Sequence, residues 1–369
     1  MNAIIRTGQV RVVGALALAT LLSACGGGQT PPVAQGSREG SGSGTAATGG
    51  DGGQINGAGA TFPNPLYSKW FSEYAKSHPD VRINYQPIGS GGGIRQLTER
   101  TVFFGATDGP MTDDQLRTAP GPILHLPTVL GAVVPVYNVP GLTADLKFSG
   151  PLLADIYLGK VKKWNDAAIT RENPGAKLPA TDIAVAHRSD GSGTTYIWVD
   201  YLSKISPEFK DKVGVATSVN WPVGVGGKGN EGVAGVVKQT PGAIGYVELI
   251  YALQNNIAYG AVKNNAGTYL KATLESVTAA AAASAASMPA DFRVSITNAD
   301  GKDAYPIASY TWILLYQSPT DKDKGRKMVA FMRWAITDGE AFTKDLGYAP
   351  LPDSVVKLEQ DALGKIQVQ

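Results

Sequence analysis

The chain has 369 residues, enough for two domains with substantial cores. A single cysteine and three histidines exclude an internal disulfide framework and a metal site built on several cysteines. The 33 Lys and Arg are nearly balanced by 31 Asp and Glu, which argues against bulk electrostatic binding to nucleic acid. A charged ligand would have to be held by local geometry, and we expect no nucleic-acid partner.

Residues 1–24 have the pattern of a signal peptide. Arg6 and Arg11 precede an apolar run, Val12–Leu22, that is shorter than a transmembrane helix usually needs. Small residues stand directly before Cys25, the only cysteine. The segment resembles a bacterial lipoprotein signal, which predicts that Cys25 is acylated and becomes the first residue of the mature protein. Cleavage without lipid and a buried structural cysteine are the alternatives.

Residues 25–53 are rich in Gly, Ser, Thr and Pro and carry almost no large apolar side chains. Such a segment cannot bury enough surface to offset the cost of ordering it. We therefore expect a flexible tether that, together with a lipid on Cys25, keeps a soluble domain close to a membrane. A disordered leader with no such role is the alternative.

From Gln54 onward, short β-rich stretches alternate with segments of helical period, which predicts an α/β fold with mostly parallel sheets. Two long β-rich runs, "ILHLPTVLGAVVPVYNV" and "AYPIASYTWILLYQ", bracket a central segment. A chain that leaves one domain, builds a second and returns would have this pattern. The expected division is 54–130 and 307–369 for domain I and 131–306 for domain II. The alanine-rich residues 279–286 are expected to form a surface helix.

Catalytic and nucleotide-binding motifs are weak or missing. The loop "RSDGSGTT" has Asp190 where a G-x-S-x-G nucleophile turn needs glycine, and no G-x-x-x-x-G-K-[ST] loop occurs. None of the three histidines has metal-ligand spacing. His187 and Arg188 alternate on an expected strand, so they should point to opposite faces. We expect neither an enzyme nor a metal or cofactor site.

Three loops share another design, in which glycines and hydroxyl side chains lie where a strand ends and a helix starts. They are "GAGATF" at 57–62, "GSGGG" at 89–93 and "DGSGTT" at 190–195. A helix start carries unpaired N–H groups and a partial positive charge, and glycine allows close approach of a ligand. Each loop taken singly is an ordinary helix cap. Three of them, together with an arginine, favour an anion site.

The chain resembles the phosphate-binding proteins of bacterial phosphate ABC transporters, the PstS type, from about Ile55 to about Pro352. The resemblance rests on many motifs in family order: "NGAGATFPNPLYSKW", "INYQPIGSGGG", "FGATDGPM", "IYLGKVKKWND", "RSDGSGTT", "VNWPVGVGGKGNEGV", "PGAIGYVELIYALQNN" and "AYPIASYTWIL". It implies a two-domain periplasmic-binding-protein fold of type II, with two crossing hinge strands and the ligand in the interdomain cleft. It also implies a monomer in the bacterial cell envelope, facing the periplasm or the exterior, that delivers inorganic phosphate to a permease and ATPase complex.

The resemblance also implies a set of ligand-binding positions. Phe62 would act through its backbone N–H, and Asp190 would orient Arg188. Gly91 stands where many relatives have a serine, so the side-chain contact of that serine is missing here. The implied phosphate ligands are Ala60, Thr61, Phe62, Ser90, Asp108, Arg188, Ser192, Gly193 and Thr194.

Asp108 would discriminate between oxyanions. A carboxylate in an anion pocket repels the ligand unless the ligand brings a proton to share, and near neutral pH phosphate carries one whereas sulfate does not. An Asp108 that only caps the turn "TDGP" is the alternative. Two other functions remain open: a phosphatase, which some proteins with a similar "INGAGATFP" stretch are associated with, and a sulfate or molybdate receptor of the same general fold.

Overall fold

The computed structural model describes residues 53–285 and 288–369. The described residues belong to one compact unit. The predicted signal peptide, Cys25 and nearly all of the predicted tether lie outside the described residues. Within the described part of the chain, no helix has both the length and the apolar character that crossing a membrane requires.

The first third of the fold is a run of alternating strands and helices, as predicted. β1 pairs in parallel with β2 on one side and with β3 on the other. The buried face of α1 carries Leu66, Tyr67, Trp70 and Tyr74, at the three- and four-residue spacing of an amphipathic helix. The elements are β1 (Gln54–Gly59), α1 (Asn64–Ser77), β2 (Arg82–Gln86), α2 (Ser90–Thr98), β3 (Phe104–Thr107) and α3 (Asp113–Thr118).

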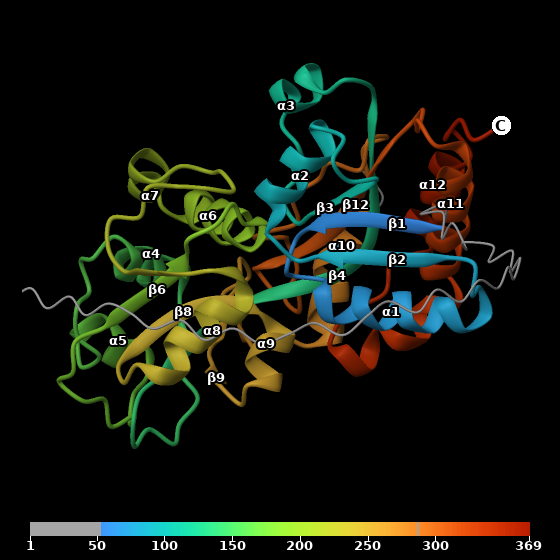
Figure 1. Cartoon of the computed structure of the whole chain (residues 1–369). Coiled ribbons are helices and arrows are strands. Elements are labelled where there is room, and N and C mark those ends of the chain that lie inside the picture. Colours follow the sequence, from blue (N-terminus) through green and yellow to red (C-terminus); the bar gives the residue numbers. More distant parts are fainter. Residues whose placement is uncertain (1–52, 286–287) are drawn as a thin grey trace, which may run out of the picture. The chain divides into compact units, whose positions relative to one another are not determined.

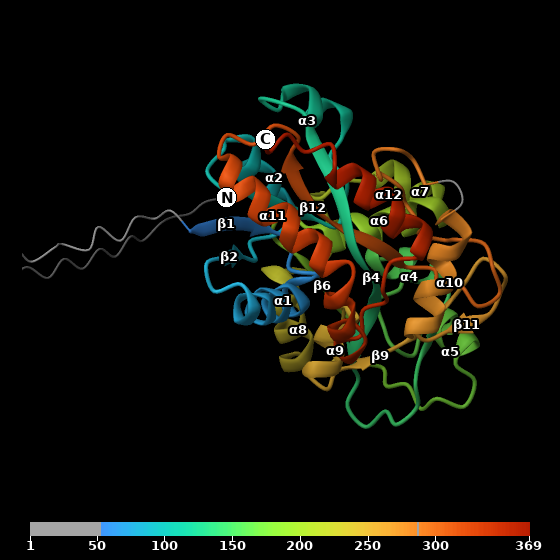
Figure 2. The ribbon, with the colours of Figure 1, turned by 90° about the vertical axis from the view of Figure 1, so that its right-hand side faces the viewer.

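One long strand, β4 (Ile123–Asn138), connects the two halves of a nine-stranded sheet (Figures 1 and 2). Its first part, to Ala132, pairs antiparallel with β12 (Ala308–Tyr316), and its second part, from Val133, pairs antiparallel with β8 (Ala243–Glu248). The strand order is β2-β1-β3-β12-β4-β8-β6-β7, in which β6 is Ala184–Arg188 and β7 is Val225–Gly227, and β9 (Ala258–Tyr259) also pairs with β4. At the change of partner, Val133 N–H donates to the carbonyl of Ile307 (2.9 Å), so the two long β-rich runs lie side by side there.

The second half of the sheet is built from the central segment of the chain. β6 pairs in parallel with both β7 and β8, and a separate small sheet joins β5, β10 and β11. The strands are β5 (Lys147–Phe148), β6 (Ala184–Arg188), β7 (Val225–Gly227), β8 (Ala243–Glu248), β9 (Ala258–Tyr259), β10 (Ala261–Lys263) and β11 (Tyr269–Leu270). The helices are α4 (Gly150–Tyr157), α5 (Ala167–Glu172), α6 (Gly193–Ile205), α7 (Pro207–Lys212), α8 (Gly229–Gln239) and α9 (Leu249–Gln254).

Two details differ from the sequence-based expectation. The sheet is mixed rather than mostly parallel, because β4 and β12 pair antiparallel where they join the two halves. The alanine-rich helix α10 (Leu274–Ala285) is not only a surface helix, because Val277, Ala280 and Ala281 are buried. Small side chains let this helix pack closely. The chain ends with α11 (Lys322–Ala335), the 3-10 helices η1 (Asp338–Phe342) and η2 (Lys344–Leu346), and α12 (Asp353–Leu363).

The topology gathers the three glycine-rich loops. β1, β2 and β6 each run in parallel with a neighbour, and their carboxyl ends lead into α1, α2 and α6. Gly89 N–H donates to the carbonyl of Gly59 (2.8 Å), which ties the second loop to the first. The third loop is closed by Ser192, whose Oγ accepts the N–H of Thr195 at the start of α6 (3.0 Å).

We expect Gly131→Ala to destabilise the protein at the point where β4 passes between the halves. A Cβ on Gly131 would lie 2.5 Å from the buried ring of Phe62, an overlap of the kind that costs about 1–3 kcal/mol. Gly235→Ala in α8 is the matched control, because a Cβ there would meet no atom within 4 Å and should stabilise the helix by about 0.5–1 kcal/mol. Urea unfolding of both variants checks this, and an unchanged midpoint for Gly131→Ala would contradict it.

Candidate anion-binding site

The second and third loops meet the carboxyl end of β3 through one hydroxyl group. Ser90 Oγ accepts the N–H of Asp108 (3.2 Å) and the N–H of Gly193 (3.0 Å). One residue further on, Gly91 N–H donates to the carbonyl of Gly191 (2.9 Å). Segments that are 103 residues apart in sequence are thus in direct hydrogen-bond contact.

Glycine is required where these loops touch. A Cβ on Gly193 would lie 2.6 Å from both the Cβ and the backbone N of Asp108. Gly89 has φ of +88° and faces the Asp190 carboxylate, whose Oδ2 would lie 2.3 Å from an added Cβ. The glycine-rich composition therefore serves close approach between the halves of the site.

Three tyrosines orient the first loop. Their hydroxyls donate to three consecutive carbonyls: Tyr85 to Ala60 (2.7 Å), Tyr251 to Thr61 (2.6 Å) and Tyr348 to Phe62 (2.6 Å). A trans peptide is planar and its N–H points opposite to its C=O. Holding the carbonyls of residues 60 and 61 on the tyrosine side directs the N–H groups of residues 61 and 62 to the other side.

Arg188 supplies the positive charge. It is 4% exposed, and its guanidinium donates to both carboxylate oxygens of Asp190, from Nε at 2.8 Å and from Nη2 at 2.5 Å. Burial by itself raises the pKa of Asp190, but the hydrogen bonds and charge of Arg188 outweigh it and hold that pKa below its usual value. The predicted role of Asp190 fits this geometry, since the bidentate contact fixes the plane of the guanidinium.

Asp108 is the acidic member of the site. Its side chain is 1% exposed, and Oδ1 accepts a hydrogen bond from Thr311 Oγ1 (2.8 Å). Burial raises the pKa of Asp108 to about 7, while that hydrogen bond and the charge of Arg188 pull it down. Near neutral pH this carboxyl can therefore either accept or hold a proton.

The structure brings the predicted residues together in the interior. Some of them have backbone groups that are already engaged: the N–H of Ala60 donates to the carbonyl of Ala106 and its carbonyl accepts from Tyr85, and the N–H of Gly193 donates to Ser90 Oγ. Ser192 N–H likewise donates to the carbonyl of Thr217. Buried members of the predicted set are Ala60, Thr61, Phe62, Ser90, Asp108, Arg188, Ser192, Gly193 and Thr194, while Asp190 is half-buried.

His187 takes no part in this cluster. Its ring stacks on Trp221, with centroids 5.2 Å apart, and its Nδ1 lies 3.0 Å from the carbonyl of Arg188. This agrees with the expectation that His187 and Arg188 point to opposite faces of β6. Among residues 53–285 and 288–369, no three His, Cys, Asp or Glu side chains are grouped so that they could hold a metal ion.

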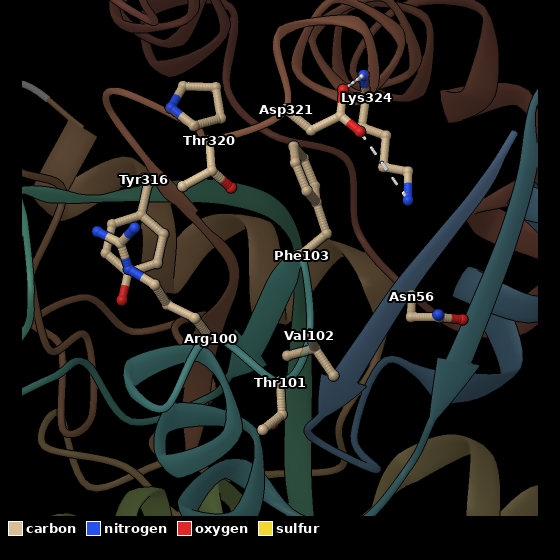
Figure 3. A pocket seen from close by; sticks show the side chains of 10 residues that line it. Asn56, Arg100, Thr101, Val102, Phe103, Tyr316, Thr320, Asp321 and Lys324 are labelled. Carbon is tan, nitrogen blue, oxygen red and sulfur yellow. Dashed lines mark hydrogen bonds and ion pairs between the residues drawn. The ribbon is translucent and has the colours of Figure 1, made fainter. Parts of the chain in front are cut away.

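A surface cavity of about 220 Å³, shown in Figure 3, is lined by none of the residues of the three glycine-rich loops. Its lining includes Asn56 of β1, Tyr316 at the end of β12 and Lys324 of α11, and Arg100 lies over the Tyr316 ring at 4.9 Å from the centroid. Asn56 and Phe103 lie near the amino ends of the parallel strands β1 and β3. The cavity is therefore at the opposite edge of the sheet from the candidate site.

Sequence reasoning missed two polar residues of the cluster. Asn230, at the start of α8, is fully buried and contacts both Thr61 and Thr194, and Thr311 on β12 holds Asp108. Asn230 lies in "GKGNEGV", a polar turn that opens a helix, so its motif was visible although its contacts were not. Thr311 stands in an apolar strand without any such signal.

Comparison with known proteins agrees with this geometry. Residues 44–339 match the PBP superfamily domain. The phosphate-binding protein PstS of Xylella fastidiosa is 48% identical over 82% of this chain and 83% of its own length, and that of Pasteurella multocida is 45% identical over 85% and 89%. The chain belongs to the PstS family of phosphate-binding proteins.

Solved structures show the same PstS-type fold at lower sequence identity. A phosphate-binding protein from Stenotrophomonas maltophilia superposes with a TM-score of 0.64, at 18% identity, over 84% of this chain and 93% of that one. A phosphate-binding DING protein bound with phosphate superposes with a TM-score of 0.67, at 20% identity, over the same shares. The predicted two-domain periplasmic-binding-protein fold is confirmed.

Asp108 should give the ligand-free protein a measurable pH dependence of stability. Because its pKa rises from 3.8 to about 7 on folding, it favours the folded state at low pH, and this contribution is lost as pH rises toward 7. Relative to Asp108→Asn, the free energy of unfolding of the parent should fall by about 4 kcal/mol between pH 4 and pH 8. Urea unfolding without phosphate measures it. The exposed control Asp303→Asn should show the same pH dependence of the free energy of unfolding as the parent. If Asp108→Asn also showed the parent's pH dependence, Asp108 would not be buried as described.

Proposed function

We propose that this protein binds inorganic phosphate outside the cytoplasmic membrane and delivers it to the permease and ATPase of an ABC transporter. The observation that carries the proposal is the composition of the site. Hydroxyls, oriented N–H groups and Arg188 surround a single carboxyl group, Asp108, that can accept a ligand proton. Relatives named as phosphate-binding proteins PstS support it.

The proposed ligand set has two parts that come from different halves of the sheet. The first half contributes Thr61, Phe62, Ser90 and Asp108, with Ala60 shaping the loop, and the second contributes Arg188, Ser192, Gly193 and Thr194. We place the domains at 54–130 with 307–369, and at 131–306. The change of pairing partner in β4 between Ala132 and Val133 supports the hinge near the first boundary.

A substrate-binding role fits better than catalysis. PstS proteins are the binding components of phosphate transporters rather than enzymes. His187 faces away from the candidate site, so it is not placed to act as a general base for the hydroxyl groups there. Turnover of p-nitrophenyl phosphate by the purified domain would reveal the phosphatase alternative, and sulfate binding as tight as phosphate binding would reveal a general oxyanion receptor.

The discrimination between phosphate and sulfate would come from proton sharing at Asp108. One of its oxygens accepts from Thr311, which leaves the other for a P–OH group. Above pH 7 the carboxyl is mostly ionised, given its pKa of about 7. An ionised Asp108 facing a fully deprotonated oxyanion places two acceptors together in a buried site, which is costly.

We expect Asp108→Asn to keep phosphate binding, with some loss, and to bind sulfate about 10- to 100-fold more tightly than the parent at pH 8. Arg188→Ala should weaken the binding of every oxyanion by about 100-fold or more, because it removes the positive charge and leaves Asp190 unpaired. Isothermal titration of both anions into both variants measures the contrast. Sulfate exclusion by Asp108→Asn as strong as in the parent would rule out proton sharing.

We propose in addition that the protein is monomeric and held in the cell envelope by a lipid on Cys25, which precedes the described residues. Cys25→Ser should move the protein from the membrane fraction to the soluble fraction and leave its phosphate affinity unchanged, because the tether separates anchor and site. Fractionation of cells followed by titration of the released protein measures both. Equal membrane association of variant and parent would contradict the anchor.

A further inference from the structure

Asn230 lies where the two halves of the candidate site meet. It is in the first turn of α8 and is fully buried. Its side-chain Nδ2 donates to Thr61 Oγ1 at 2.9 Å and to Thr194 Oγ1 at 3.1 Å. Thr61 belongs to the loop after β1 and Thr194 to the start of α6, so one amide group contacts a hydroxyl from each half.

The orientation of this amide is fixed by the backbone. The N–H of Glu248, at the end of β8, donates to Asn230 Oδ1 (3.0 Å). A backbone N–H can only donate, so the atom facing it must be the oxygen and the NH₂ group must face the two threonines. Its two hydrogens serve one hydroxyl each.

The consequence for the hydroxyls follows from counting lone pairs. Thr61 Oγ1 accepts from Asn230 Nδ2 and from Asn230 N–H (3.3 Å). Thr194 Oγ1 accepts from Asn230 Nδ2 and from Arg188 Nη1 (3.3 Å). A hydroxyl has two acceptor lone pairs and one proton, so each threonine has only its O–H left to offer.

The Ser90 hydroxyl is also left with only its O–H to donate, although it does not contact Asn230, because both of its lone pairs accept backbone N–H groups. All three hydroxyls therefore face a ligand as donors. A site of this kind suits an anion whose oxygens are acceptors, and it leaves Asp108 as the place where a ligand proton is accepted.

We propose that Asn230 is a specificity-determining positioning residue, which turns Thr61 and Thr194 into donors toward the ligand and joins the two halves across the closed site. This rests on the proposed phosphate function and deepens it. Asn230 does not need to touch the ligand, since it acts through the two hydroxyls. Its bond to Thr61 crosses between the halves, so it forms only when they are together.

A double-mutant cycle tests the proposal by phosphate titration. Asn230→Ala should lower phosphate affinity about 10-fold or more, the effect of a lost hydrogen bond in a buried site, and Thr194→Val should do the same in the parent. In the Asn230→Ala background, Thr194→Val should cost no more than about twofold, because a hydroxyl that is no longer held as a donor contributes little. If the fold-loss of phosphate affinity in the double variant equalled the product of the two single losses, the proposal would be overturned.

Asn230→Asp gives a second readout that a purely structural role would not produce. Aspartate matches asparagine in shape and keeps the oxygen that faces Glu248 N–H, so a role in packing predicts a milder effect than that of Asn230→Ala. The proposal predicts the reverse, at least 10-fold weaker phosphate binding than in Asn230→Ala at pH 8. The carboxylate adds a negative charge beside the anion, and it also presents an acceptor to Thr61 and Thr194 and draws their protons away from the ligand. Affinity of Asn230→Asp equal to or better than that of Asn230→Ala would overturn it.

Lowering the pH should partly restore phosphate binding by Asn230→Asp, since a protonated carboxyl at position 230 is again a hydrogen-bond donor. The charged and titratable groups around the position are Asp108, Arg188, Asp190, Glu231, Glu248 and Tyr251, so the pH profile is compared with that of the parent, which shares them. An Asn230→Asp profile that parallels the parent's would overturn the proposal.

Two controls separate this proposal from its alternatives. Asn173→Ala removes another buried amide in the same half, one that bonds to the backbone of Lys147 and Ile169, and it should lower the unfolding temperature without changing phosphate affinity. Asn230→Ser replaces Asn230→Ala in the cycle if thermal unfolding shows that the latter is not folded. Absence of phosphate binding in the parent itself would refute the proposed function, whereas normal parent binding with no coupling would refute only the role of Asn230.

Discussion

The hydrogen bonds of Ser90 Oγ to the N–H groups of Asp108 and Gly193 are the contact on which the site depends. A hydroxyl of one loop can reach two backbones only if no side chain keeps them apart, which is why glycine occupies 193 and also 89, 91 and 191 nearby. The same contact brings the start of α2, the end of β3 and the start of α6 to one place. The partial positive charges of the two helix starts then act together.

Negative groups in the same interior have to be balanced. Asp190 is paired with Arg188, and Asp108 is held by Thr311 and has a pKa raised by burial. Glu248 is fully buried, burial raises its pKa well above the usual value, and its Oε1 has no hydrogen-bond partner in the described part of the chain. Burial thus disfavours the charged form of Glu248, which would add a second repulsive charge beside the candidate anion site.

The tyrosines extend this polar network into the surrounding fold. Tyr85 comes from β2, Tyr251 from α9 and Tyr348 from the segment before α12, yet their hydroxyls bind three consecutive carbonyls of the first loop. Each ring is buried in the core or packed against it, and only the hydroxyl reaches a polar partner. The direction of the loop's N–H groups is therefore set by residues 25 to 286 positions away in sequence.

Sequence alone predicted the alternation of strands and helices from Gln54 onward, because hydrophobic period and glycine-rich turns are local properties. Family motifs further indicated Arg188, Asp190, Asp108 and the three loops. Only the tertiary structure decided that Asn230 bridges Thr61 and Thr194, that Thr311 holds Asp108, and that α10 is half-buried. Those facts depend on which distant segments face one another, and a hydrogen bond between residues 169 positions apart leaves no periodic trace in the chain.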